Sequence, residues 1–127
     1  MLEKHIEMQL IQLIQKVNPA FILLFGSFAK GTNREDDSDI DLAYFSKKQL
    51  SSYERFTFAG ELAEAAGHEV DLVDLKQIDI VFTMQIFSQG IPIYIKGENE
   101  FTRQKMRTYN MYATLSEQRA NVIDSIQ

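Results

Sequence analysis

The stretch Ser38-Asp39-Ile40-Asp41-Leu42 contains two aspartates separated by one apolar residue and followed by another. Side chains of a β-strand alternate between two faces, so a strand here places Asp39 and Asp41 on one face and Ile40 and Leu42 on the other. The apolar pair fixes the strand against a core, and the two carboxylates then lie side by side. Two carboxylates this close repel each other. A divalent cation that prefers oxygen ligands, such as magnesium, removes the repulsion when it binds between them. The alternative is a solvated acidic turn, because three further acidic residues directly precede Ser38.

A short apolar run at residues 20–25 lies upstream of the acidic strand and predicts a second strand, buried on both faces. Gly26-Ser27 follows this run directly, and we expect residues 28–38, which include Lys30 and Gly31, to form two irregular turns. Ligands of α/β sheets bind beyond strand ends, where a glycine lets backbone N–H groups approach a phosphate and a serine adds a donor. Gly-Ser is also common at plain strand ends, which is the alternative interpretation.

A third carboxylate occurs in residues 69–75, where the sequence Glu-Val-Asp-Leu-Val-Asp-Leu predicts another strand. Asp71 would be an ion among apolar neighbours there, which is unfavourable without a partner. Neighbouring strands lie about 4.8 Å apart, so Asp71 reaches the face of Asp39 and Asp41 if the two strands pair. We expect Asp74 on the opposite face or at the strand end, with a structural role. Three carboxylates beside a phosphate-binding turn predict a two-metal site for phosphoryl-group chemistry.

The rest of the chain predicts helices and one more strand around this site. In chain order the expected elements are a helix over residues 2–17, strands over 20–25 and 39–45, a helix over 51–66, a strand over 69–75, a helix over 79–88, a strand over 91–95 and a last helix from Asn99 to the end. Tyr53 and Phe56 are among the apolar positions at helical spacing in the second of these helices. Pro92 favours an edge position for the last strand. The order indicates a mixed α/β layer architecture.

Composition narrows the class of protein further. The chain has 127 residues, of which 45% are hydrophobic and 24% charged, which is typical of one globular domain, expected here over residues 1–127. It has no cysteine, which excludes disulfides, thiolate metal sites and a cysteine nucleophile. It has only two histidines, which excludes a three-histidine zinc site within one chain. A net charge of −5 without a basic block argues against general nucleic-acid binding. With neither a long apolar run nor a signal-peptide profile, we expect a cytoplasmic protein without a membrane segment.

The motifs Gly26-Ser27-Phe28-Ala29-Lys30-Gly31, Ser38-Asp39-Ile40-Asp41-Leu42 and Val70-Asp71-Leu72 together resemble the minimal nucleotidyltransferases of the DNA polymerase β superfamily. More narrowly, they resemble the MNT antitoxins that accompany HEPN toxins. No single motif is specific for this family, but the order and combination of the three motifs over about residues 20–75 are highly specific for it. Eleven residues separate Ser27 from Asp39, one more than is typical of that family, and we expect the extra residue in the turn at residues 32–37.

The resemblance implies an α/β (α+β) nucleotidyltransferase fold, with a mixed sheet of about four strands and helices on one side. It implies magnesium-dependent transfer of AMP from ATP to a hydroxyl, with pyrophosphate as leaving group. Asp39 and Asp41 would ligate two magnesium ions, and Asp71 would complete one metal site and help to deprotonate the attacking hydroxyl. Such reactions depend on positioning and charge neutralisation more than on covalent catalysis.

Phosphate binding and the acceptor also follow from the resemblance. Gly26 and Ser27 would hold the β- and γ-phosphates of ATP, and Lys30 would help to neutralise them. The acceptor would be a tyrosine of a cognate HEPN-type RNase toxin, which the modification silences. Two alternatives remain at this stage: a non-catalytic antitoxin that inhibits its toxin by occlusion, and a nucleotidyltransferase that acts on a small molecule or RNA.

The last helix has more apolar residues than one narrow core stripe requires. They are Met106, Tyr109, Met111, Tyr112, Leu115, Val122, Ile123 and Ile126. Methionine and aromatic residues are enriched at protein interfaces, so one hypothesis is that this helix contacts a partner or forms a homo-oligomer with a second copy. The other is that it covers the open face of the sheet.

Overall fold

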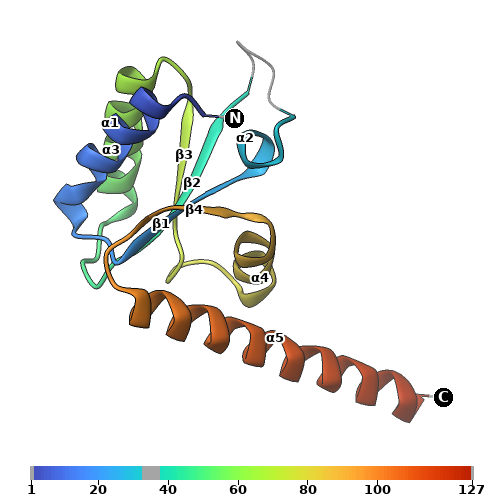
Figure 1. Ribbon diagram of the computed structural model, residues 1–127. Helices are drawn as coiled ribbons and strands as arrows, with labels where there is room; N and C mark the ends of the chain where they lie inside the picture. The colour runs from blue at the N-terminus through green and yellow to red at the C-terminus, as the bar shows by residue number, and fades with distance from the viewer. Residues whose placement is uncertain (1, 33–37, 127) are drawn as a thin grey trace.

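The fold is known from a computed structural model that describes residues 2–32 and 38–126, with side chains up to residue 122 (Figure 1). The elements in chain order are α1 (Lys4–Ile14), the 3-10 helix η1 (Gln15–Val17), β1 (Phe21–Phe25), α2 (Gly26–Lys30), β2 (Ile40–Phe45), α3 (Ser52–Ala66), β3 (Val70–Asp74), α4 (Ile80–Gln89), β4 (Ile91–Ile95) and α5 (Glu98–Ile126). The predicted order is confirmed except for α2, a short helix where irregular turns were expected.

The four strands form one mixed sheet in the order β3-β2-β1-β4. Strand β1 pairs antiparallel with both β2 and β4, whereas β2 and β3 are parallel. The predicted mixed sheet is therefore confirmed, and β4 lies at an edge as Pro92 indicated. The carboxyl end of β1 and the amino ends of β2 and β3 meet at the same end of the sheet, which is the end next to α2 (Figure 1).

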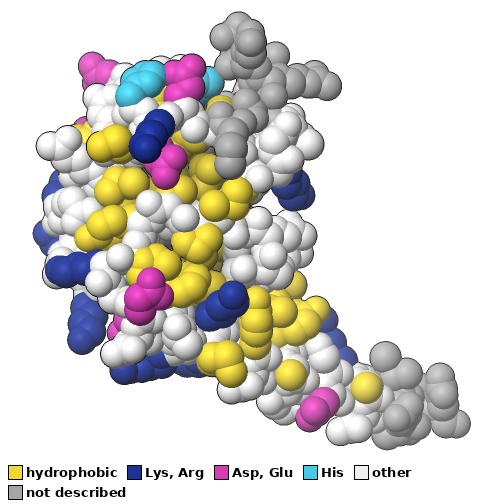
Figure 2. All heavy atoms as spheres, viewed as in Figure 1, with side chains coloured by type: hydrophobic (Ala, Val, Ile, Leu, Met, Phe, Trp, Pro, Cys, Tyr) yellow, Lys and Arg dark blue, Asp and Glu magenta, His cyan; other side chains and the backbone are white. Residues whose placement is uncertain are grey.

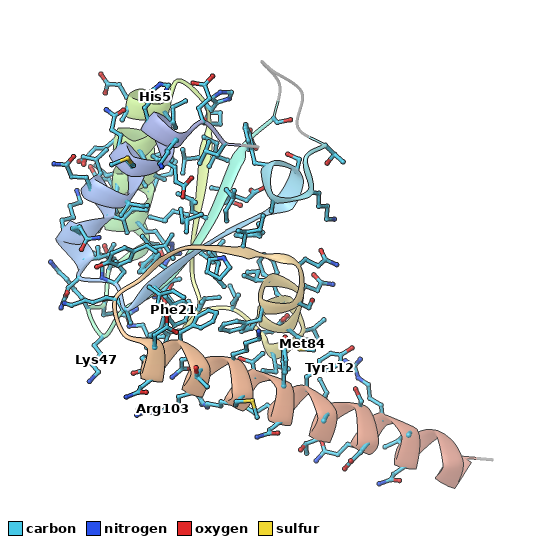
Figure 3. The ribbon with its side chains drawn as sticks, in the orientation of Figure 1. His5, Phe21, Lys47, Met84, Arg103 and Tyr112 are labelled. Carbon is cyan, nitrogen blue, oxygen red and sulfur yellow. The ribbon has the colours of Figure 1, made fainter. Side chains whose placement is uncertain are left out.

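Helices cover both faces of the sheet, so the expectation of helices on one side is wrong. Alternate residues of β1 enter two separate cores: Ile22 and Leu24 pack with α1 and α3, whereas Phe21 and Leu23 pack with α4 and α5. Phe21, labelled in Figure 3, meets Phe101 of α5 edge-on with ring centroids 5.0 Å apart. The physical reason is the apolar run of β1 itself, because a strand without a polar face needs cover on both sides.

Phe28 and Ala29 anchor helix α2 to the core. Phe28 is buried, and its ring lies edge-on to the ring of His68, which directly precedes β3. Gly31 ends the helix in the left-handed conformation, with φ of 73°, and its N–H donates to the carbonyl of Ser27. Five residues are too few to show helical periodicity, which is why the sequence pattern indicated turns. Residues 33–37, where the extra residue of the turn was expected, lie outside the described residues.

Helix α5 covers the sheet with its first half and extends past it with its second half (Figure 1). Phe101 and Tyr109 pack into the core with α4, and Thr108 is buried, which confirms the covering role. Hydrophobic side chains gather where α5 meets the rest of the molecule, and fewer appear along the coloured part of the helix beyond that contact (Figure 2). Met111 is exposed, and the side chains beyond residue 122, including Ile123 and Ile126, lie outside the described part. Contact with a partner or a second copy stays a prediction.

No helix within the described residues, α5 included, combines the length and the apolar content that crossing a bilayer requires.

Candidate active site

Asp41 and Asp71 lie side by side on the two parallel strands. Asp41 of β2 is in register with Asp71 of β3 on one side and with Phe25 of β1 on the other. Residues in register on neighbouring strands point to the same face of a sheet, so the two carboxylates share one face. The expected pairing of these strands is therefore confirmed, and it brings together two aspartates that are thirty positions apart in the sequence.

Asp39 lies just outside the strand in which it was expected. Strand β2 begins at Ile40, whose backbone N–H donates to the carbonyl of Glu69, and Asp39 precedes it with an exposed side chain. It remains close enough for its charge to act on Asp41.

The electrostatics of the site centre on Asp41. Its burial, and then the charges of Asp71 and Asp39, raise the pKa of Asp41 from the ordinary value of 3.8 to about 6. Each of these causes disfavours the charged form, and the last two are repulsions between like charges. A cation held between the carboxylates would remove those repulsions.

The close approach of β1 to Asp41 requires Gly26. Gly26 has a φ of 72°, in the left-handed region that glycine adopts without strain. A Cβ atom at this position would lie 2.1 Å from Oδ2 of Asp41. The sequence assigned Gly26 to phosphate binding, and the structure adds that a side chain here would collide with the carboxylate of Asp41.

Ser27 and Lys30 lie at opposite ends of α2. Ser27 is half-buried beside Gly26 in the first turn, and its carbonyl accepts hydrogen bonds from the N–H groups of Gly31 and Thr32. The N–H groups of a first helical turn have no acceptor within the helix, so they remain free to meet an anion. Lys30 is exposed at the last position of α2.

The donor set suits a hard cation. Aspartate oxygens are the ligands that magnesium prefers, and magnesium commonly binds through one or two carboxylates completed by substrate phosphates and water. Asp41 and Asp71 supply such a pair. The described residues contain no group of three or more His, Asp or Glu side chains already gathered for a metal ion. The residues therefore fit magnesium bound together with a nucleotide better than a cage made of protein ligands alone.

The burial of Asp41 and its repulsion by Asp71 and Asp39 predict that the stability of the metal-free protein depends on pH. Because folding raises the pKa of Asp41 from 3.8 to about 6, the folded state binds the extra proton more tightly than the unfolded state between these pH values. The free energy of unfolding is therefore expected to fall as the pH rises through this range. Asp41→Asn removes the charge and should flatten this slope, with a gain of about 1 kcal/mol at pH 7 after solvent screening.

Urea unfolding across this pH range, in the presence of a chelator, measures the slope. The matched control is Asp79→Asn at the N-cap of α4, where asparagine also caps well and the slope should persist. If the free energy of unfolding of Asp41→Asn depends on pH as steeply as that of wild type, the pH dependence does not come from Asp41.

Two other polar residues of these strands, Asp74 and Tyr44, are buried in the fold. Asp74 is buried on the face opposite to Asp71, and its Oδ1 accepts from the N–H of Lys76, in agreement with the expected structural role. Tyr44 is buried in the core, and its burial and the charge of Asp74 raise its pKa to about 12. Within the described residues, neither the Tyr44 hydroxyl nor Oδ2 of Asp74 has a hydrogen-bond partner.

Sequence reasoning missed a groove beside β3. It has a volume of about 590 Å³ and is lined by residues of α3, among them Arg55, Phe56 and Gly60, and by residues 69–72, which include Asp71. Phe56 was expected on the apolar face of its helix but is 77% exposed, and the buried position is Phe58 instead. The apolar spacing of this segment fits either register, so no signal in the sequence marks the groove.

Comparison with known proteins identifies the family. The family model described as polymerase beta nucleotidyltransferase matches residues 8–99. The chain is 32% identical over 122 residues to the protein adenylyltransferase MntA of Shewanella oneidensis, which covers 94% of this chain and 86% of that protein.

Two solved structures extend this similarity to the fold. A chain of a toxin–antitoxin complex with AMP-PNP matches with a TM-score of 0.82 and 32% identity, over 94% of this chain and 97% of that chain. The second structure is the complex of the tri-AMPylated Shewanella oneidensis HEPN toxin with the MNT antitoxin. One chain of this complex matches with a TM-score of 0.78 and 29% identity, over 97% of each chain. The chain therefore belongs to the polymerase beta nucleotidyltransferase family.

Proposed function

We propose that this protein transfers AMP from ATP to a tyrosine hydroxyl of a cognate HEPN-type RNase toxin and so acts as its antitoxin in the cytoplasm. The observation that carries the proposal is the in-register pair Asp41 and Asp71, of which Asp41 lies against Gly26 at the end of β1. The relatives support the chemistry, because one is named a protein adenylyltransferase, one complex holds AMP-PNP, and another holds an AMPylated HEPN toxin.

In the proposed reaction the tyrosine oxygen attacks the α-phosphorus of ATP. The new bond joins this oxygen to phosphorus, the bond from the α-phosphorus to the bridging oxygen breaks, and pyrophosphate leaves with the electron pair. Asp71 accepts the hydroxyl proton and passes it to solvent. Gly26 and Ser27 hold the β- and γ-phosphates through their backbone and hydroxyl groups, and Lys30 neutralises part of their charge.

Magnesium belongs to this proposal. Asp39, Asp41 and Asp71 would hold two magnesium ions, which when bound neutralise the charge that develops on the phosphate oxygens. Without the cation, the raised pKa of Asp41 indicates that its charge is poorly compensated.

Intact-mass spectrometry tests the function directly. The protein is incubated with ATP and magnesium, with and without the product of the neighbouring gene, which this proposal expects to be the HEPN-type toxin. The expected result is a gain of one or several AMP units on that protein, which fragmentation assigns to a tyrosine. Omission of magnesium, or addition of a chelator, should abolish the gain.

A stable complex of the two proteins without a mass change would contradict catalysis and favour inhibition by occlusion. A mass gain on RNA or on a small hydroxylated molecule in place of the protein would retain the chemistry but overturn the proposed acceptor.

A further inference from the structure

The groove beside β3 opens onto the free edge of the sheet. Among the residues that the structure describes, β3 is the last strand on its side of the sheet and has β2 as its one neighbour. Ile40 N–H donates to the carbonyl of Glu69, and Leu75 N–H donates to the carbonyl of Tyr44. In a parallel ladder the residues that bond to the neighbour alternate, so the backbone groups of Val70 and Leu72 point away from β2. An unpaired edge of this kind is a template for another extended chain.

One wall of the groove is formed by α3. Phe56 is 77% exposed and lies on this wall with Arg55 and Gly60. A Cβ atom at Gly60 would have no other atom within 4 Å, so the groove is open at this point. An exposed phenylalanine next to an unpaired strand provides an apolar contact and backbone hydrogen bonds together, which is the combination that recognises an extended peptide.

Asp71 belongs both to this groove and to the active site. It lines the groove, and its carboxylate lies on the same face of the sheet as Asp41. In a strand added beside β3, side chains alternate between the α3 face and the face of Asp71. A residue placed opposite Asp71 therefore directs its side chain to the active-site face, while its neighbours on either side face Phe56.

We propose that this groove receives an extended segment of the acceptor protein, which pairs with the edge of β3 as an added strand and presents its tyrosine at Asp71. This inference rests on the proposed function, which requires an acceptor hydroxyl beside Asp71. A second copy of this chain is a less suitable occupant, because it would cover the carboxylate that the acceptor must reach.

The test measures transfer of AMP to the HEPN-type protein by Gly60→Gln and Phe56→Ala. Glutamine at position 60 fills the groove from an exposed helical site and is expected to raise KM for the acceptor protein about tenfold or more. Phe56→Ala removes the apolar contact and should raise the same KM about fivefold. In both variants kcat at saturating acceptor and the Kd for AMP-PNP should stay within about twofold of wild type, because the nucleotide site is untouched.

Tyr53→Ala is the matched control for Phe56→Ala. Tyr53 lies on the same helix with nearly the same exposure, 78%, but does not line the groove, so its removal should leave KM unchanged. An unchanged KM in both groove variants, with normal transfer by the wild type, would overturn the docking groove alone. Loss of self-association in Gly60→Gln without a change in KM would overturn it in favour of a second copy. Absence of transfer by the wild type would overturn the proposed function, and this inference with it.

Discussion

The double variant Asp39→Asn/Asp41→Asn is expected to lose transfer of AMP by a factor on the order of 10³ or more. Both substitutions keep the size of the side chain and remove a negative charge that the proposed metal ions require. Asp41 lies in register with Asp71, so Asp41→Asn leaves Asp71 as the one charged member of that pair. Asp39→Asn removes the third carboxylate. Binding to the HEPN-type protein should remain, since neither change alters a buried apolar contact.

The measurement combines the rate of AMP transfer, followed by mass spectrometry, with the affinity of the complex. Asp79→Asn is the control, because that aspartate caps α4 and its Oδ1 accepts from Phe82 N–H, a role that asparagine preserves. The double variant should also fail to protect cells from the toxin. If it protects them as well as wild type does, inhibition proceeds by occlusion and the catalytic account of protection is wrong.

Gly26→Ala is expected to damage both folding and transfer. The added Cβ meets Oδ2 of Asp41 at 2.1 Å, and the residue has a φ of 72°. The left-handed conformation costs roughly 1–2 kcal/mol for a residue with a Cβ, and relief of the clash costs about 1–3 kcal/mol more. Because the relief displaces the Asp41 carboxylate, transfer should fall by about 10²-fold even in the folded fraction.

Gly31→Ala separates the cost of the left-handed backbone from the cost of the clash with Asp41. Gly31 has nearly the same φ, 73°, but a Cβ there would meet no atom within 4 Å. It should therefore show the conformational cost alone, with nearly normal transfer by the folded protein. Urea unfolding and transfer assays on the two variants measure the difference. Equal losses of stability and activity in both would show that backbone strain, and not the contact with Asp41, accounts for the requirement for glycine.

The sequence was most informative where apolar and charged residues alternate. The spacing of Asp39, Ile40 and Asp41 predicted a strand with one acidic face, and the structure differs by one residue, since Asp39 precedes β2. The helix over residues 51–66 was also predicted within one residue, because its apolar residues have helical spacing and Gly67 is a strong C-terminal stop. Its buried face was predicted only in part. Leu62 and Ala66 are buried at the predicted helical spacing, but Tyr53 and Phe56 are exposed, because the apolar residues at positions 53, 56 and 58 fit two registers. Only packing against the sheet selected Phe58 over Phe56.

By itself, the sequence determined the order of the elements along the chain, the position of Asp41 in β2 and the glycine at the end of β1, since these depend on residue periodicity and local backbone preference. The tertiary structure alone decided the rest. It placed Asp71 beside Asp41 through parallel pairing, raised the pKa of Asp41 by burial and repulsion, and brought Gly26 into contact with its carboxylate. It also left the edge of β3 open beside Phe56. These properties depend on distances between residues far apart in the chain, which local sequence patterns do not encode.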